Sequence, residues 1–373
     1  MLDRLPPEIC DHIFDFACRD TGYTGCSLSL VSKYIQQAAA PTRYLSVALM
    51  NRAQILAFAP LVEHSEALFH TRYLYLKGLE DEEAMQRIEH AAYAGATKAS
   101  GEYRELRKQL SAEDEKVDEA KVDEAKAASD RYAKAAAEMV EFGKEGARAI
   151  ETVLRHLASN LEVLDISFNE HVAKQMVNTL SLPLLRDLTT RGGFPMYPNA
   201  DVGQDFPILG ATNSLRHLHI VETFDQWNAT DAFTQNGISY FAPCLTHLRF
   251  SELRNNTGTD ETTIEYLEKS LGWVGTVHRK GITLLPSTLQ LVIMKPTVEP
   301  PPHKGCFCTD DTPEYYEMVK VARRLRDRDH RVVLLNADPE DSTEDVYFQE
   351  WKEKVNGMPC RWDTSDADMT PSE

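Results

Sequence analysis

The sequence of 373 residues contains no long hydrophobic run. No stretch reaches about 18 consecutive apolar residues, the length that crosses a bilayer, so no membrane span is expected. The first residues also lack the uncharged core of a signal peptide, because Asp3, Glu8, Asp11 and Asp15 interrupt them. The cysteines, seven in number and scattered, favour reduced thiols and therefore a cytoplasmic or nuclear location.

Basic residues are outnumbered by acidic ones. The chain has 40 lysines and arginines against 58 aspartates and glutamates, which gives a formal net charge of -18. A chain with this balance repels phosphate backbones, so nucleic acid is not an expected partner.

Motifs of catalysis and cofactor binding are missing as well. Neither Gly-rich phosphate loop (GxxxxGK[ST] or GxGxxG) is present, nor is the GxSxG elbow or the HExxH motif. The nearest approach to a metal site is His303, Cys306 and Cys308, which lack the fourth ligand that zinc requires. The acidic segment 336–345 does not have the spacing of a calcium loop. We therefore expect a non-catalytic protein without a cofactor or a metal.

What the chain does have, almost at its start, is an apolar helical stretch. In "LPPEICDHIFDFAC" two prolines precede a pattern in which Ile9, Ile13 and Phe16 share one helical face. A second apolar row beside it contains Cys10, Phe14 and Cys18. A helix that is apolar on two sides must be covered on two sides.

The next segment continues a small helical module over residues 5–50. Leu28, Val31, Ile35 and Ala38 predict one helix that Pro41 ends, and "RYLSVAL" alternates like a strand. The module is too small to be very stable by itself.

The order L-P-P-E-I, H-I-x-x-F and L-x-L-V-S-K resembles the F-box, in the form abundant among fungal F-box proteins. The resemblance covers residues 5–50 only, and Ile35 stands where an aromatic residue is usual. It implies docking onto the Skp adaptor of SCF-type ubiquitin ligases, through residues that face the adaptor or support that face: Leu5, Pro6, Pro7, Ile9, Ile13, Leu28 and Val31. The alternative is that residues 5–50 only cap the domain that follows.

A leucine pattern then returns along the rest of the chain. The string L-x-x-L-x-apolar, or a close variant, occurs at 161–166, 184–189, 215–220, 245–250 and 289–294, with weaker copies at 73–78 and 331–336. Amphipathic helical patterns lie between these strands, and a period of about 20–30 residues is typical of leucine-rich repeats. The predicted fold class is thus α/β, a small N-terminal helical F-box followed by an irregular leucine-rich-repeat-like solenoid with a parallel sheet. A compact α/β domain with a parallel sheet is the alternative.

Charge and composition suggest further boundaries. Residues 111–140 carry "KVDEAKVDEA", which favours helix but builds no apolar stripe, so it predicts a solvated helix or a disordered insertion, or else a docking arm. The polar tail is expected to be disordered. We divide the chain into five parts: the F-box (1–50), linker helices with a first repeat-like unit (51–110), the insertion (111–140), a partner-binding repeat domain (141–340), and a C-terminal helix with an acidic tail (341–373).

Three histidines fall in the predicted strands. His217 and His247 occupy equivalent places and are expected to stack on the outward face, with His219 also outward and with Arg216 and Arg249 on the opposite face. They are either ordinary exposed positions or part of a concave partner-binding surface.

The function predicted from these features is that of a substrate-recognition subunit of an SCF-type E3 ubiquitin ligase. It would bind the Skp adaptor, and through it a cullin-RING ligase, with residues 5–50, and an unidentified protein substrate with the repeat region. One alternative is a ligase-independent interaction scaffold. Another is an enzyme whose site is assembled from unrelated loops.

Overall fold

The computed structural model describes most of the sheet, the helices around it and part of the C-terminal tail. The described residues are 5–64, 70–78, 119–167, 172, 175–176, 180–191, 196–199, 204–207, 210–221, 232–233, 237–253, 263–272, 282–299, 312–337, 344–358, 362 and 364–371. The candidate metal ligands His303, Cys306 and Cys308, and residues 338–343 of the acidic segment, lie outside these ranges.

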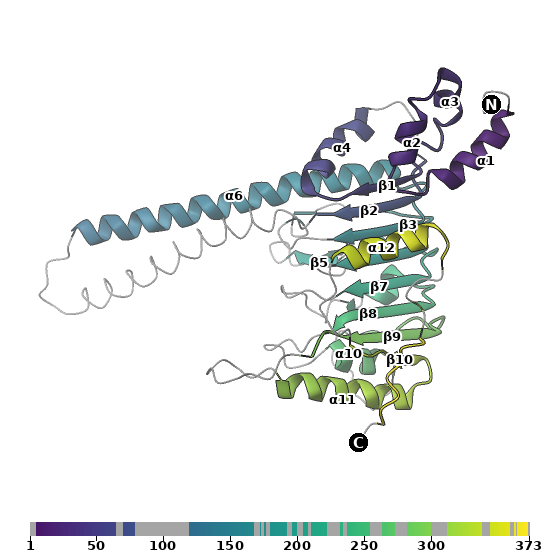
Figure 1. Ribbon diagram of the computed structural model, residues 1–373. Coiled ribbons are helices and arrows are strands. Elements are labelled where there is room, and N and C mark those ends of the chain that lie inside the picture. Colours follow the sequence, from purple (N-terminus) through teal and green to yellow (C-terminus); the bar gives the residue numbers. More distant parts are fainter. Residues whose placement is uncertain are drawn as a thin grey trace, which may run out of the picture.

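An eight-stranded, all-parallel sheet forms the centre of the protein, and its strands follow one another in chain order (Figure 1). The strands are β1 (Ser46–Leu49), β2 (Tyr73–Lys77), β3 (Val163–Ser167), β4 (Asp187–Arg191), β7 (His217–Val221), β8 (His247–Leu253), β9 (Leu291–Pro296) and β10 (Val332–Leu334). Each predicted strand segment overlaps one of them, so the α/β class and the parallel sheet are confirmed.

One small sheet was not predicted. The strands β5 (Met196–Asn199) and β6 (Gln204–Pro207) form an antiparallel pair between β4 and β7 in the chain. Each contains a proline, which weakens the strand signal in the sequence.

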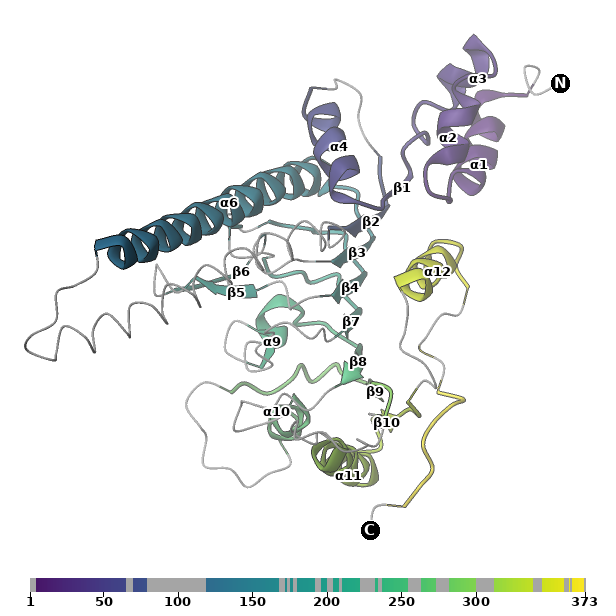
Figure 2. The same cartoon turned by 60° about the vertical axis from the view of Figure 1, so that its left-hand side comes forward.

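Helices cover the two faces of the main sheet unequally (Figure 2). On one face lie α4 (Arg52–His64), α6 (Glu119–Leu157), α9 (Ile238–Phe241), α10 (Thr263–Ser270) and α11 (Thr312–Arg328). On the other face lies α12 (Glu344–Val355). The first face supplies the main hydrophobic core, in which leucines of neighbouring strands stand in register, for example Leu164, Leu188, Leu218 and Leu248.

Helix α6 runs across the boundary predicted at residue 140. Its last turns bury Ile150, Val153, Leu154 and Leu157 in the main core, as their periodic spacing predicts. Its first turns project past the sheet (Figure 1), and the side chains described between 126 and 138 are exposed. The charged segment from Glu119 onward and the core helix are thus one continuous element. Its projecting part has no apolar stripe with which to pack.

Three short helices form the N-terminal module: α1 (Pro7–Ala17), α2 (Tyr23–Leu28) and α3 (Lys33–Ala38). The single helix predicted over 28–38 is wrong, because α2 ends at Leu28, residues 29–31 form a turn and Ser32 is extended. The Ser32 hydroxyl accepts a hydrogen bond from the Ile35 amide and caps α3.

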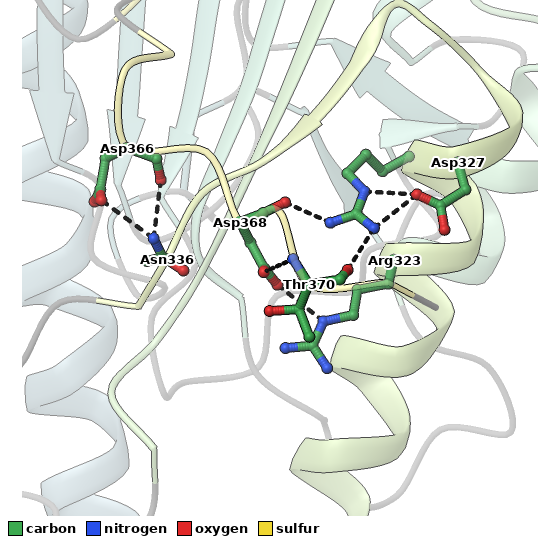
Figure 3. A network of polar contacts seen from close by, with 7 residues as sticks. Arg323, Asp327, Asn336, Asp366, Asp368 and Thr370 are labelled. Atoms are coloured by element: carbon green, nitrogen blue, oxygen red, sulfur yellow. Dashed lines mark hydrogen bonds and ion pairs between the residues drawn. The ribbon is translucent and has the colours of Figure 1, made fainter. Parts of the chain in front are cut away.

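The C-terminal tail covers one edge of the sheet. Residues 364–371, predicted to be disordered, lie beside β10, where the Asp368 amide donates to the Leu334 carbonyl at 2.7 Å. Figure 3 shows the side chains that hold the tail: Arg323 of α11 pairs with Asp368 at 2.9 Å, and Asn336 donates to Asp366. These contacts hold in place a segment that its polar composition predicts to be disordered.

Among the described helices, none combines the length and the apolar character needed to cross a membrane.

Candidate functional site

Helix α1 separates its two apolar rows. Cys10, Phe14 and, just after the helix, Cys18 are buried in a second core that also contains Ile35 and Trp351. The other row stays open, with Ile9 46% and Ile13 42% exposed. The sequence predicts both rows, and the structure adds which of them is free.

The turn after α1 is built tightly by local side chains. The Asp20 carboxylate accepts hydrogen bonds from the amides of Gly22 and Thr24, each at 2.9 Å. Gly22 has a φ of 92°, which favours glycine. A side chain at Gly25 would place its Cβ 2.1 Å from the Arg43 carbonyl oxygen, so only glycine fits there. The position of α2 against α1 is thus fixed by the sequence "DTGYTG".

The structure exposes most of the predicted adaptor-binding residues. Pro6, Pro7, Ile9, Ile13 and Val31 are exposed, whereas Leu5 and Leu28 are half-buried and pack against the second core. The Tyr34 hydroxyl donates to the Leu5 carbonyl and holds the start of the chain on the module.

Sequence reasoning left three exposed apolar side chains out of the predicted set. Phe16 lies on the open row of α1, Tyr23 begins α2, and Leu30 stands beside Val31. Of these, Phe16 could have been predicted from the sequence, since it shares the helical face of Ile9 and Ile13. We define the N-terminal apolar patch as Ile9, Ile13, Phe16, Tyr23, Leu30 and Val31.

The second candidate surface is the face of the sheet that lies under α12. The central row of this face crosses four neighbouring strands in register and consists of Asp165, Thr189, His219 and Arg249. The row before it contains Asp187, His217 and His247. The row after it contains Arg191 and Ser251. We call these nine residues the polar sheet face. The rows between them, which point to the opposite side, contain the leucines of the main core.

The polar sheet face contains one buried ion pair and a set of hydrogen bonds. Arg191 and Asp165 approach to 2.7 Å, and both side chains are almost fully buried. The Arg249 Nε donates to the Ser251 hydroxyl, which also lies 2.9 Å from the His219 Nε2. Burial raises the pKa of Asp165, and the Arg191 guanidinium opposes that shift.

Helix α12 lies over this face and contacts it with one side. Phe348 and Trp351 pack on Tyr75 of β2, with ring centroids 5.2 and 5.6 Å away. On the same side of the helix, the Tyr347 ring lies 5.2 Å from the Arg191 guanidinium. The Lys354 ammonium donates to Asp187 and to Thr189, each at 2.7 Å. The buried side of α12 therefore combines aromatic contacts with Tyr75 and polar contacts with the sheet.

The contact with Lys354 changes the pKa of Asp187. Burial alone would raise the pKa of Asp187, but the Lys354 ammonium and a hydrogen bond with His217 hold that pKa below its ordinary value. The carboxylate is thus the charged form in the folded protein.

The stacked histidines are confirmed. The rings of His217 and His247 lie 4.8 Å apart, and Trp362 contacts both at 5.3 and 5.4 Å. Burial, and then the neighbouring His217, lower the pKa of His247.

Two expectations for the neighbouring side chains need correction. His219 lies on the same face but is buried beneath α12, where the Tyr347 ring is 6.4 Å away. Arg249 shares that face, in register with His219, because residues two apart in a strand point the same way. The prediction that Arg249 faces the opposite side is wrong.

Within the described part of the chain, no group of three or more His, Cys, Asp or Glu side chains is placed to hold a metal ion. The four cysteines described there are free, and burial raises the pKa of the Cys18 thiol to about 11.

The chain matches no protein-family model, no curated protein and no solved structure. Function must therefore be inferred from the two surfaces themselves.

Proposed function

We infer that this protein is the substrate-recognition subunit of an SCF-type E3 ubiquitin ligase, with residues 5–50 acting as an F-box. The observation that carries the proposal is the open row of α1. A helix that buries Cys10 and Phe14 while it leaves Ile9, Ile13 and Phe16 in solvent has apolar surface for a partner.

The composition of the patch suits a stable protein interface. It includes two aromatic side chains, Phe16 and Tyr23, a kind enriched at protein interfaces, beside aliphatic ones. The module beneath it is fixed by the second core and by the Asp20 turn, so the patch is presented in one arrangement. A preorganised surface binds at lower entropic cost.

The rest of the chain would then carry the substrate. We assign the parallel sheet and its helices to a degenerate leucine-rich-repeat-like solenoid, which the chain-order strands and the leucines in register support. In this assignment the polar sheet face corresponds to the concave surface. The protein performs no covalent step: it raises the effective concentration of a substrate lysine near the loaded conjugating enzyme.

Co-expression with a Skp adaptor tests the docking half of the proposal. Wild type and an Ile9→Asp/Ile13→Asp variant are compared with a matched control, Leu61→Asp/Val140→Asp. The control replaces two residues that are similarly exposed, 46% and 41%, but lie outside the module. We expect a stoichiometric complex for wild type and control and none for the Ile9/Ile13 variant.

Single truncations give the size of the effect. Ile9→Ala or Ile13→Ala is expected to weaken adaptor binding by about 2 kcal/mol, roughly 30-fold in Kd, measured by titration calorimetry. If no version binds the adaptor while all remain folded by circular dichroism, the ligase assignment fails, and a ligase-independent scaffold becomes the better description.

A further inference from the structure

One row of residues crosses the main sheet at the edge where its parallel strands begin. Each member lies directly before a strand, and its amide donates to the carbonyl of the member before it at 2.8–3.0 Å. We call it the strand-start row, and its members in order are Arg72, Glu162, Arg186, Arg216, Thr246 and Gln290. Neighbouring members are thus one strand spacing apart, about 4.8 Å.

The first arginine of the strand-start row is held by carboxylates. The Arg72 Nε donates to Glu162 at 2.8 Å, and its guanidinium lies 3.7 Å from Asp15 of α1. The hydrogen bond with Glu162 raises the pKa of Arg72. Its charge is therefore already matched within the protein.

The two central arginines of the row are different. Among the described residues, no carboxylate is paired with Arg186 or Arg216. Arg186 is exposed, and Arg216 is half-buried. The Arg216 guanidinium donates to the carbonyls of Asn213 and Leu215 at 2.7 and 3.1 Å, which fixes its position without neutralising its charge. The centre of the row therefore presents two guanidinium groups on neighbouring strands.

The side chains beside these arginines add little negative charge. Asp187, which follows Arg186, is bound by the Lys354 ammonium at 2.7 Å and lies 3.4 Å from His217. The half-buried rings of His217, His247 and Trp362 lie together at the start of β7 and β8. An aromatic shelf thus borders the two arginines, and helix α12 leaves it partly open.

The charge of the whole chain limits what can bind there. A net charge of -18 repels a long polyanion such as nucleic acid, which would extend over the rest of the surface. A short acidic segment is affected mainly by charges within about 8 Å, since salt screens the others. Guanidinium groups bind carboxylates in a two-pronged geometry. Carboxylates at alternate positions of an extended chain are about 6.6 Å apart, a spacing that two flexible arginines on neighbouring strands can reach.

We propose that Arg186 and Arg216, with the aromatic shelf beside them, form a docking surface for an extended acidic protein segment, whose Asp or Glu carboxylates pair with the two guanidinium groups. Helix α12 stays in place in this arrangement. The inference rests on the proposed function only for calling that segment part of the substrate. The surface itself does not depend on adaptor binding.

The test uses full-length protein and two rhodamine-labelled Gly/Ser peptides that differ only at two alternate positions, which are Glu in one and Gln in the other. Binding is followed by anisotropy at about 50 mM salt. We expect wild type to bind the Glu peptide at least about fivefold more tightly than the Gln peptide. The variant Arg186→Gln/Arg216→Gln should lose this preference.

The matched control is Arg148→Gln/Arg324→Gln. It replaces two exposed arginines on α6 and α11 and changes the net charge by the same amount. It should keep the preference of wild type. Arg186→Gln alone removes no described side-chain hydrogen bond, so it gives a second variant if the double variant does not fold. For it we expect a partial loss of the preference.

The outcomes separate this inference from the ligase assignment. Equal binding of the two peptides by wild type, or an equal loss in the control, overturns the docking surface. Binding of a matched phosphoserine peptide without a preference for Glu over Gln would mean that phosphate is recognised, which overturns a carboxylate partner. Adaptor co-expression is repeated with each variant. A wild type that prefers the Glu peptide but binds no adaptor counts against the ligase assignment alone.

Discussion

The two faces of the central sheet are built from the same strands but differ in kind. On the side of α6 and α11 most of the inward residues are buried aliphatic or aromatic groups, such as Leu218 and Phe250. On the side of α12 the residues between them include Asp165, Arg191 and His219. Burial of apolar area stabilises the first face without regard to the identity of its neighbours. The second depends on pairing, and pairing discriminates among partners. The apolar face is thus held by buried area, and the polar face by matched pairs of groups.

The largest effect is expected from breaking the buried pair on the polar face. Arg191→Met leaves the Asp165 carboxylate buried beside an apolar chain and should lower the free energy of unfolding by about 3–5 kcal/mol. Urea denaturation measures this. The double variant Asp165→Leu/Arg191→Met should regain most of the loss, because no isolated charge remains. A single variant that loses less than about 1 kcal/mol would mean that the pair contributes little and that polarity is not what distinguishes this face.

On the apolar face, the free energy of unfolding should fall when a substitution creates a cavity in the main core. Leu248→Ala removes a fully buried side chain at the centre of the main core and should lower the free energy of unfolding by about 3 kcal/mol in the same urea assay. Leu184→Ala, at a half-exposed position, should change it by less than about 1 kcal/mol. Equal losses at the two positions would contradict the assignment of the main core to this face.

How far the sequence predicts this architecture can be judged from particular elements. The alternation of leucines located the strands, because a period of two is a direct consequence of strand geometry. The break at Ser32 was missed because a capping serine and an ordinary helical serine look alike in an apolar pattern. The length of α6 was missed because its two halves have different surroundings although they form one helix.

The N-terminal apolar patch was predictable only in part, because its burial depends on contacts that the local pattern does not contain. Helical spacing places Ile9 and Ile13 on one row and Phe14 on another, but both rows are apolar, and only the second core decides which is buried. Nothing in the strand pattern says that α12 returns to cover His219. The misplacement of Arg249 is different, since the period of two by itself puts Arg249 on the face of His247.

A smaller effect is expected from the contact between α12 and the sheet. Lys354→Ala removes the cation that lowers the pKa of Asp187 and should cost about 1–2 kcal/mol at neutral pH. Because that pKa is lower in the folded state than in the unfolded chain, the stabilisation is complete above about pH 4 and is lost as the pH falls through the folded pKa. Urea titrations of wild type and variant should therefore converge in acid. A difference that persists when Asp187 is protonated would mean that Lys354 acts through its Thr189 hydrogen bond or its packing, and not through the Asp187 pair.

The smallest effect is expected at the stacked histidines, where the polar face meets the tail. Burial and the nearby His217 lower the pKa of His247, so the unfolded chain takes up a proton first as the pH falls. Stability is complete above about pH 6.5, the ordinary histidine value, and is lost as the pH falls from there through the folded pKa. His247→Gln should remove part of the decrease in Tm between pH 7.5 and 5.5, while His64→Gln, at an exposed position on α4, should leave it unchanged. If His247→Gln keeps the full decrease, then other groups account for the acid sensitivity, and the contact of Trp362 with the two rings is independent of their charge.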